Sequence, residues 1–215
     1  MAFFMRSGEF VRDIPIKKIL IAEDCRTLYQ KRSASAASNM LQKAVRYYDY
    51  LHLRKYEPKI MSKFDAVTLV SPEDIAACRE RNSEANYFSL TNGTDLDKFA
   101  PPERPRRCKK ILFTGRLDVE ANRIMLKRII YGMIPEIFRR VPDAELHVAG
   151  AFPGRDIRKM LESDKRIFFH EQVPSMEPYL KNARVYLHPH KGGSGIQNKL
   201  LEAMSGSLIQ RAEAE

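Results

Sequence analysis

The sequence is poor in cysteine and has no long apolar run. Its 215 residues include three cysteines, Cys25, Cys78 and Cys108, whose wide spacing fits no zinc, redox or disulfide pattern. We therefore expect reduced thiols and no metal site. The apolar residues 2–5 are followed by Arg6 and Glu9, so this run is too short for a signal peptide or a membrane span. We expect a cytoplasmic protein, with the inner face of the cell membrane as the alternative location.

Signatures of several binding classes are missing too. The chain has neither the dinucleotide fingerprint nor the P-loop spacing, and it has no aromatic RNA-binding signature or basic zipper arm. Its net charge of +10 favours an anionic partner, which could be nucleic acid, an anionic membrane or a phosphorylated small molecule. An ordinary solvated surface explains most of this charge, because the basic residues are spread along the chain. The net charge alone does not identify the class of partner.

The second half of the chain alternates between strand-like and helix-like segments. Short apolar runs predict strands at residues 111–114, 145–149, 166–169 and 184–187. Apolar residues recur at helical spacing from Ile124 to Phe138, which predicts a long helix that Pro135 would kink or divide. Residues 156–162 predict another helix. This alternation indicates a parallel α/β sheet.

The first half has fewer signals. Strands are predicted at residues 18–22, 66–70 and 87–90, and a long helix at about 35–63, interrupted at Pro58. Ser71 and Pro72 predict the start of a shorter helix, as its N-cap and first helical residue. The prolines and charges of residues 97–109 mark a linker. We therefore divide the chain into a domain at 1–96, this linker, a domain at 110–206 and an atypical tail at 207–215.

A glycine-rich turn after the last predicted strand is the sharpest candidate for a ligand site. Residues 192–195 precede a helix that runs from Ile196 to Met204, and glycines followed by a helix N-terminus suit a phosphate group. A tight turn that binds nothing is the alternative. Arg116 follows the first strand of this half through Gly115, so its guanidinium lies at the sheet edge where α/β folds bind ligands, unless it is an ordinary surface arginine.

Three ordered segments carry a family resemblance. They are ILFTGRLD at 111–118, PDAELHVAG at 142–150 and GGSGIQNKLLEAM at 192–204, and together they resemble the donor domain of glycosyltransferase family 4. In the first half, FDAVTLVS at 64–71 and TNGTDLDKF at 91–99 are similar to the later part of that family's acceptor domain. The resemblance implies a GT-B-like α/β fold of two Rossmann-like parallel-sheet domains. By the same resemblance we expect both domains to be incomplete and the reading frame to be truncated or frame-shifted.

The resemblance also implies an activity. Such an enzyme, of the hexosyltransferase type, moves a sugar with retention from a UDP- or GDP-linked donor to a glycan or lipid-linked acceptor, usually with no bound metal or other cofactor. Surface polysaccharide biosynthesis is the expected pathway. Arg116 would neutralise the diphosphate and Glu202 would hold the ribose hydroxyls, so these are the candidate catalytic residues. The implied donor-binding residues are Gly115, Arg116, Gly193, Ser194, Gly195, Ile196, Lys199 and Glu202.

The sequence departs from the family pattern in several places. Ser194 stands where many members have a glutamate that contacts the donor sugar. The basic residue that commonly partners the strand-end arginine has no certain match near Asn122, although Lys127 and Arg128 lie further along the helix. Glu23 and Asp24 stand where many members have a His-Asp pair, which leaves no obvious active-site histidine. His188 and His190 flank a proline at a strand end, where a structural role is favoured over metal ligation.

Two other functions are therefore kept beside glycosyl transfer. The chain could be a catalytically inactive remnant of the same ancestry that binds nucleotide or a partner protein. A basic nucleic-acid-binding module has only the net charge to support it and is disfavoured. Peripheral contact with an anionic membrane is a further partner that the charge permits.

Overall fold

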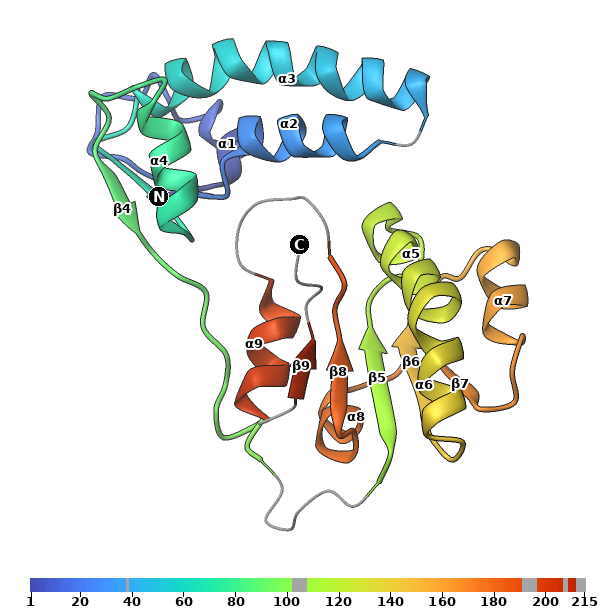
Figure 1. Cartoon of the computed structure of the whole chain (residues 1–215). Helices are drawn as coiled ribbons and strands as arrows, with labels where there is room; N and C mark the ends of the chain where they lie inside the picture. The colour runs from blue at the N-terminus through green and yellow to red at the C-terminus, as the bar shows by residue number, and fades with distance from the viewer. Residues whose placement is uncertain (38, 102–107, 191–196, 207–208, 212–215) are drawn as a thin grey trace. The chain divides into compact units, whose positions relative to one another are not determined.

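The computed structural model describes residues 1–37, 39–101, 108–190, 197–206 and 209–211. The chain forms two compact units, one of residues Met1–Asn92 and one of Gly93–His190 with the segment that starts at Gln197. Each unit is an α/β structure built on its own parallel sheet (Figure 1). Within the described residues, no helix is both long and apolar enough to cross a bilayer.

The first unit has a four-stranded sheet in the order β1-β2-β3-β4, and its neighbouring strands are parallel. The strands are β1 Ala2–Phe3, β2 Ile19–Glu23, β3 Ala66–Leu69 and β4 Tyr87–Ser89, so the three predicted strands are confirmed. The helices are α1 Phe4–Gly8, α2 Arg26–Ala36, α3 Met40–Met61 and α4 Pro72–Arg79. Leu20, Val67 and Leu69 are fully buried and form the core with Ile60 and Met61.

The predicted helix at about 35–63 is wrong in its start and in its break. Two helices, α2 and α3, lie side by side here (Figure 1). Asn39 begins α3, because its side-chain oxygen accepts a hydrogen bond from the Leu41 amide at 2.8 Å. Pro58 does not interrupt α3, since it lies in the last turn. The start of α4 is as predicted, with the Ser71 hydroxyl accepting from the Asp74 amide at 3.1 Å.

The second unit has a five-stranded parallel sheet in the order β7-β6-β5-β8-β9. The strands are β5 Lys110–Thr114, β6 Glu145–Gly150, β7 Ile167–Glu171, β8 Val185–Leu187 and β9 Ile209–Arg211. The first four confirm the predicted strands, and β9 lies within the stretch assigned to a tail. The chain proceeds from β5 to β6 and β7, then crosses to β8 on the other side of β5. This reversal makes the carboxyl ends of β5 and β8 the place where such sheets bind ligands.

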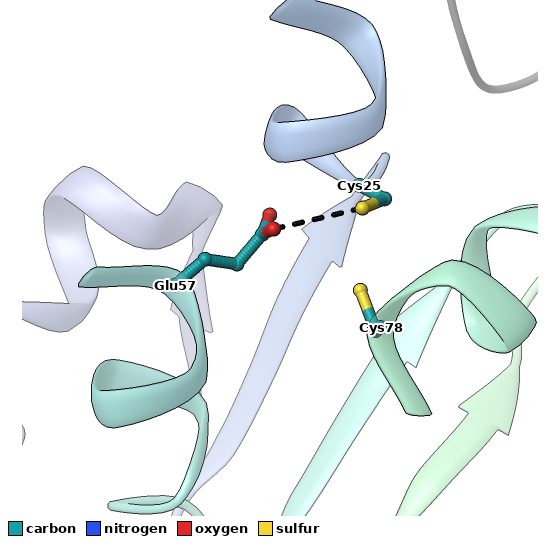
Figure 2. A group of neighbouring side chains, drawn as sticks. All are labelled: Cys25, Glu57 and Cys78. Carbon is teal, nitrogen blue, oxygen red and sulfur yellow. Dashed lines mark hydrogen bonds between the residues drawn. The ribbon is translucent and has the colours of Figure 1, made fainter. Parts of the chain in front are cut away.

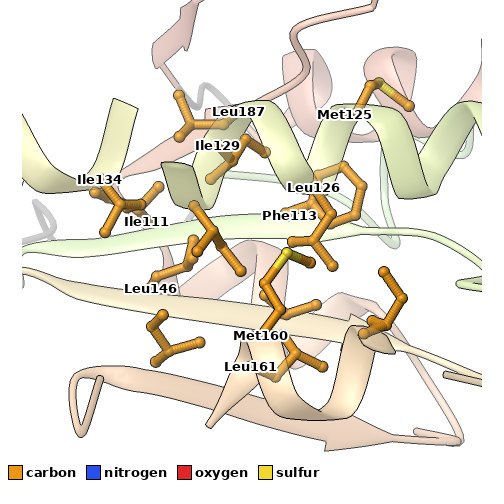
Figure 3. Packing of buried hydrophobic residues seen from close by; sticks show 14 of the residues in the cluster. Ile111, Phe113, Met125, Leu126, Ile129, Ile134, Leu146, Met160, Leu161 and Leu187 are labelled. Carbon is orange, nitrogen blue, oxygen red and sulfur yellow. The ribbon is translucent and has the colours of Figure 1, made fainter. Parts of the chain in front are cut away.

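Helices cover both faces of this sheet. A continuous helical run comprises α5 Glu120–Lys127, the π-helical η1 Arg128–Met133 and α6 Ile134–Arg140, and Pro135 lies in the first turn of α6. With α7 Arg155–Leu161 it packs on Ile111 and Phe113 of β5 (Figure 3). Leu112 points to the opposite face and packs with the side covered by α8 Glu177–Asn182 and α9 Asn198–Ser205. The predicted helices are confirmed here, because strong apolar periodicity matched the buried faces.

Candidate functional site

The chain turns sharply where β5 ends, at the first predicted site residue. Gly115 has a φ of +156°, a conformation that residues with a side chain rarely adopt. Its amide donates to the Ala149 carbonyl at 3.1 Å, and a Cβ placed on Gly150 would lie only 2.3 Å from the Gly115 carbonyl oxygen. The backbones at the ends of β5 and β6 thus approach more closely than a side chain at Gly150 would permit.

Lys199 reaches this turn from the first part of α9. Its Nζ donates to the Asn122 side-chain oxygen at 2.9 Å and lies 3.4 Å from the Thr114 carbonyl oxygen. Asn122 in turn donates to the Arg116 carbonyl at 2.8 Å. Removal from water lowers the pKa of Lys199 to about 8. A partly buried ammonium group is therefore held at the carboxyl end of β5, between the β5 turn and α9.

Arg116 lies at the same sheet edge, with an exposed side chain. Its Nε and one terminal nitrogen donate to the two carboxylate oxygens of Asp118 at 3.1 and 2.6 Å. This pair raises the pKa of Arg116 and lowers the pKa of Asp118. Exposed ion pairs of this kind are weak, so an anion that arrives at the site can compete with Asp118 for the guanidinium.

Glu202 lies one helical turn beyond Lys199 and is partly buried. Burial raises the pKa of its carboxyl group, and Lys98 opposes this shift. Its negative charge also helps to raise the pKa of Tyr186, whose hydroxyl is 2.7 Å from the Thr114 hydroxyl oxygen. Glu202 therefore lies within electrostatic range of Tyr186 on β8. The other predicted donor-binding residues, Gly193, Ser194, Gly195 and Ile196, lie outside the described residues.

Two further side chains, those of Arg128 and His188, lie near the end of β8. Arg128 of η1 donates to the Pro189 carbonyl at 3.3 Å, a position that only the packing of η1 on the sheet reveals. His188 is buried, and neither of its ring nitrogens makes a hydrogen bond of standard geometry to the described residues. Burial, with Lys199 and His190 nearby, lowers the pKa of His188 to about 3, although Gln197 opposes the shift. His188 is therefore neutral at physiological pH.

The first unit has a cavity of about 970 Å³ beside the carboxyl end of β2. Glu23 and Asp24 line it, as do Asp49 and His52 from α3. His52 thus supplies a histidine beside the acidic pair for which the sequence offered none. Sequence reasoning missed it because α3 returns along α2 and brings a distant residue to the cavity. Phe3 and Phe4 also line the cavity, with exposed rings.

Cys25, Glu57 and Cys78 form a buried group whose side-chain ligand atoms lie within 4.8 Å of one another (Figure 2). Cys25 and Cys78 are free thiols that lie far apart in the sequence and meet because distant segments pack together in the core. Glu57 accepts from the amides of Arg26 at 2.8 Å and Thr27 at 3.3 Å, at the start of α2.

Arg81 supplies the positive charge beside this group. Its guanidinium lies 2.9 Å from the Cys25 sulfur and 3.5 Å from the Glu57 carboxylate. The hydrogen bonds to Glu57 and the charge of Arg81 hold the start of α2 on the core. The cluster therefore has a structural role. A cation that bound the three ligand atoms would meet the guanidinium at close range, so the residues do not fit a metal site.

Part of the second unit is similar to a known protein family. Residues 108–209 match the family model of glycosyl transferases group 1. No curated protein matches the chain in sequence.

Solved structures of similar fold cover both units. Sucrose-phosphate synthase from Thermosynechococcus elongatus aligns with 98% of this chain at a TM-score of 0.73 and 18% identity. TarM aligns with 75% of it at 0.63 and 17% identity. The pneumococcal O-GlcNAc transferase GtfA, solved with UDP and GlcNAc, aligns with 94% of it at 0.60 and 13% identity. The chain spans 54%, 32% and 43% of these three structures, respectively. These likenesses confirm the GT-B-like α/β fold.

Proposed function

We propose that the second unit binds a nucleoside diphosphate sugar, UDP- or GDP-linked, and that the protein transfers the sugar with retention to a glycan or lipid-linked acceptor. The proposal includes a hexosyltransferase reaction in the cytoplasm, in surface polysaccharide biosynthesis, with no bound metal or other cofactor. The group 1 match of residues 108–209 supports the reaction class. The observation that carries the proposal is the position of Lys199.

Lys199 holds a positive charge where a diphosphate would need it. The carboxyl ends of β5 and β8 are the ligand-binding edge of a sheet with this strand order. Keeping an ammonium group there, away from water, costs free energy, and desolvation is the cause of its lowered pKa. A diphosphate beside Lys199 would supply the missing negative charge. Lys199 is thus proposed to act as the basic partner of Arg116, for which the family pattern gives no certain match near Asn122.

The proposed roles follow from where charge develops. Cleavage of the bond between sugar and phosphate leaves extra negative charge on the diphosphate, and cations fixed beside it stabilise the transition state. Arg116 and Lys199 are the proposed cations, with Arg116 exchanging Asp118 for the phosphate oxygens. Glu202 would accept hydrogen bonds from ribose hydroxyls. Backbone amides at residues 193–196 are proposed to complete the diphosphate-binding site.

The cavity of the first unit is the proposed acceptor site. Its carboxylates, Glu23, Asp24 and Asp49, can accept hydrogen bonds from sugar hydroxyls, and a ring nitrogen of His52 can form a further hydrogen bond. The exposed rings of Phe3 and Phe4 can stack on the apolar face of a sugar or contact a lipid chain.

Calorimetry with UDP, GDP and a short DNA duplex, followed by a donor hydrolysis assay with and without EDTA, tests the proposal. Binding of one nucleotide and EDTA-resistant hydrolysis that gives the retained anomer by NMR would support it. Nucleotide binding without turnover would favour the inactive relative. If neither nucleotide binds while DNA binds in a salt-sensitive way, the proposal fails.

A further inference from the structure

The first three turns of α3 expose apolar side chains to solvent. The exposed fractions are 79% for Met40, 73% for Leu41, 62% for Tyr48, 54% for Val45, 54% for Tyr47 and 40% for Leu51. At about 100° per residue, these six positions fall within one sector of roughly 160°. We call these six residues the outer face of α3. The opposite side of the helix, with Leu53, Tyr56 and Ile60, packs into the first unit.

The charges of α3 are divided between its two sides. Its exposed charged residues are all basic, and they are Lys43, Arg54, Lys55 and Lys59. Both acids of the helix face the protein instead: Glu57 is buried, and Asp49 accepts from the Gln30 side chain at 3.1 Å. At about 100° per residue, Lys43 and Arg54 border one edge of the apolar outer face, and Lys55 and Lys59 continue the same side of the helix in the following turns.

We propose that the outer face of α3 lies on an anionic membrane surface. Helices that rest in the interfacial plane bury an apolar face between headgroups and acyl chains, while lysines and arginines attract anionic lipids. Tyr47 and Tyr48 are of the residue type that favours the membrane–water interface. Nucleic acid would match the cations but would leave the apolar residues in water. This inference uses the first unit alone and does not depend on the proposed function.

Vesicle flotation of the full chain tests the charge requirement. The chain should bind vesicles of phosphatidylcholine with one-quarter phosphatidylglycerol and bind pure phosphatidylcholine far more weakly. Lys43→Glu, Arg54→Glu and Lys55→Glu together should reduce partitioning by at least about 100-fold, since each cation near such a surface contributes roughly fivefold. The matched control reverses three exposed charges of the second unit, with Arg155→Glu, Lys159→Glu and Lys165→Glu, and should retain the wild-type partitioning within about tenfold.

A tryptophan reporter tests which face is buried, because the chain has no tryptophan of its own. Val45→Trp should shift its emission to the blue and become accessible to brominated acyl chains when anionic vesicles are added. Tyr131→Trp, at a position that is 67% exposed in the second unit, should do neither. Equal binding by the two triple variants, or an unchanged Val45→Trp spectrum on bound vesicles, would overturn the proposal. So would a blue shift without vesicles that accompanies dimerisation in sedimentation, since a second copy would then cover the face.

Discussion

Lys199 Nζ lies 2.9 Å from the side-chain oxygen of Asn122, which joins the start of α9 to α5 at the end of β5. Asn122 also donates to the Arg116 carbonyl, so one amide group holds both the lysine and the turn that carries the arginine. The amide has no charge, and the positive charge of Lys199 is therefore available to a ligand.

Nucleotide affinity should fall as the pH rises above about 8. The pKa of Lys199 is lowered to about 8, so the side chain is protonated below this pH and neutral above it. Loss of a charge-assisted hydrogen bond should weaken UDP binding by about tenfold or more. Calorimetry between about pH 7 and 9.5 measures this change. Lys199→Arg, which stays charged, should give a flat profile, and Lys199→Met should bind weakly throughout. A wild-type profile as flat as that of Lys199→Arg would contradict this role.

Gly150→Ala should destabilise the second unit by about 1–3 kcal/mol and weaken UDP binding, because its Cβ would meet the Gly115 carbonyl oxygen at 2.3 Å. Urea unfolding and calorimetry measure the two effects. Gly132→Ala is the control, since nothing lies within 4 Å of its Cβ and alanine favours the helix. We expect that variant to be unchanged or slightly more stable. Equal stability of the two variants would show that the strand ends do not approach this closely.

Glu57→Gln should destabilise the first unit by about 3 kcal/mol. The substitution leaves the Arg81 guanidinium without its buried carboxylate partner and weakens the cap of α2. Glu73→Gln is the matched control, because Glu73 pairs with Arg32 at an exposed position and such pairs contribute at most about 1 kcal/mol. Urea unfolding of both variants provides the comparison. A smaller loss in Glu57→Gln than in Glu73→Gln would mean that the cluster does not hold α2 in place.

The elements of the second unit could be predicted from sequence because each apolar run matched a buried strand or helix face. Ile111, Phe113 and the helix from Ile124 onward are examples. The joining of α2 to the core could not be predicted, since it depends on contacts such as Glu57 with Arg26 that only the tertiary structure creates. The same holds for His52 at the cavity and for Arg128 at the end of β8. Patterns report local periodicity, and these residues meet through long-range packing.

Stability should fall as the pH drops below about 6.5, in part through His188. Its pKa is about 3 in the folded protein and near 6.5 when unfolded. The unfolded state therefore binds more protons between these values, which favours unfolding at lower pH. Other groups titrate in this range, so the comparison with His188→Phe isolates the contribution. The wild type should lose more stability than this variant between pH 7 and 4.5 in urea titrations. Parallel losses would show that His188 is not held neutral.

The most direct test of the proposed diphosphate-binding site is calorimetric titration of UDP and GDP into four variants. Arg116→Ala removes a proposed diphosphate partner and Glu202→Ala a proposed ribose partner, so each should weaken binding of the preferred nucleotide by about tenfold or more. Arg139→Ala and Glu162→Ala remove exposed charges elsewhere in the second unit and should bind as the wild type does. Unchanged affinity in both Arg116→Ala and Glu202→Ala would contradict the account.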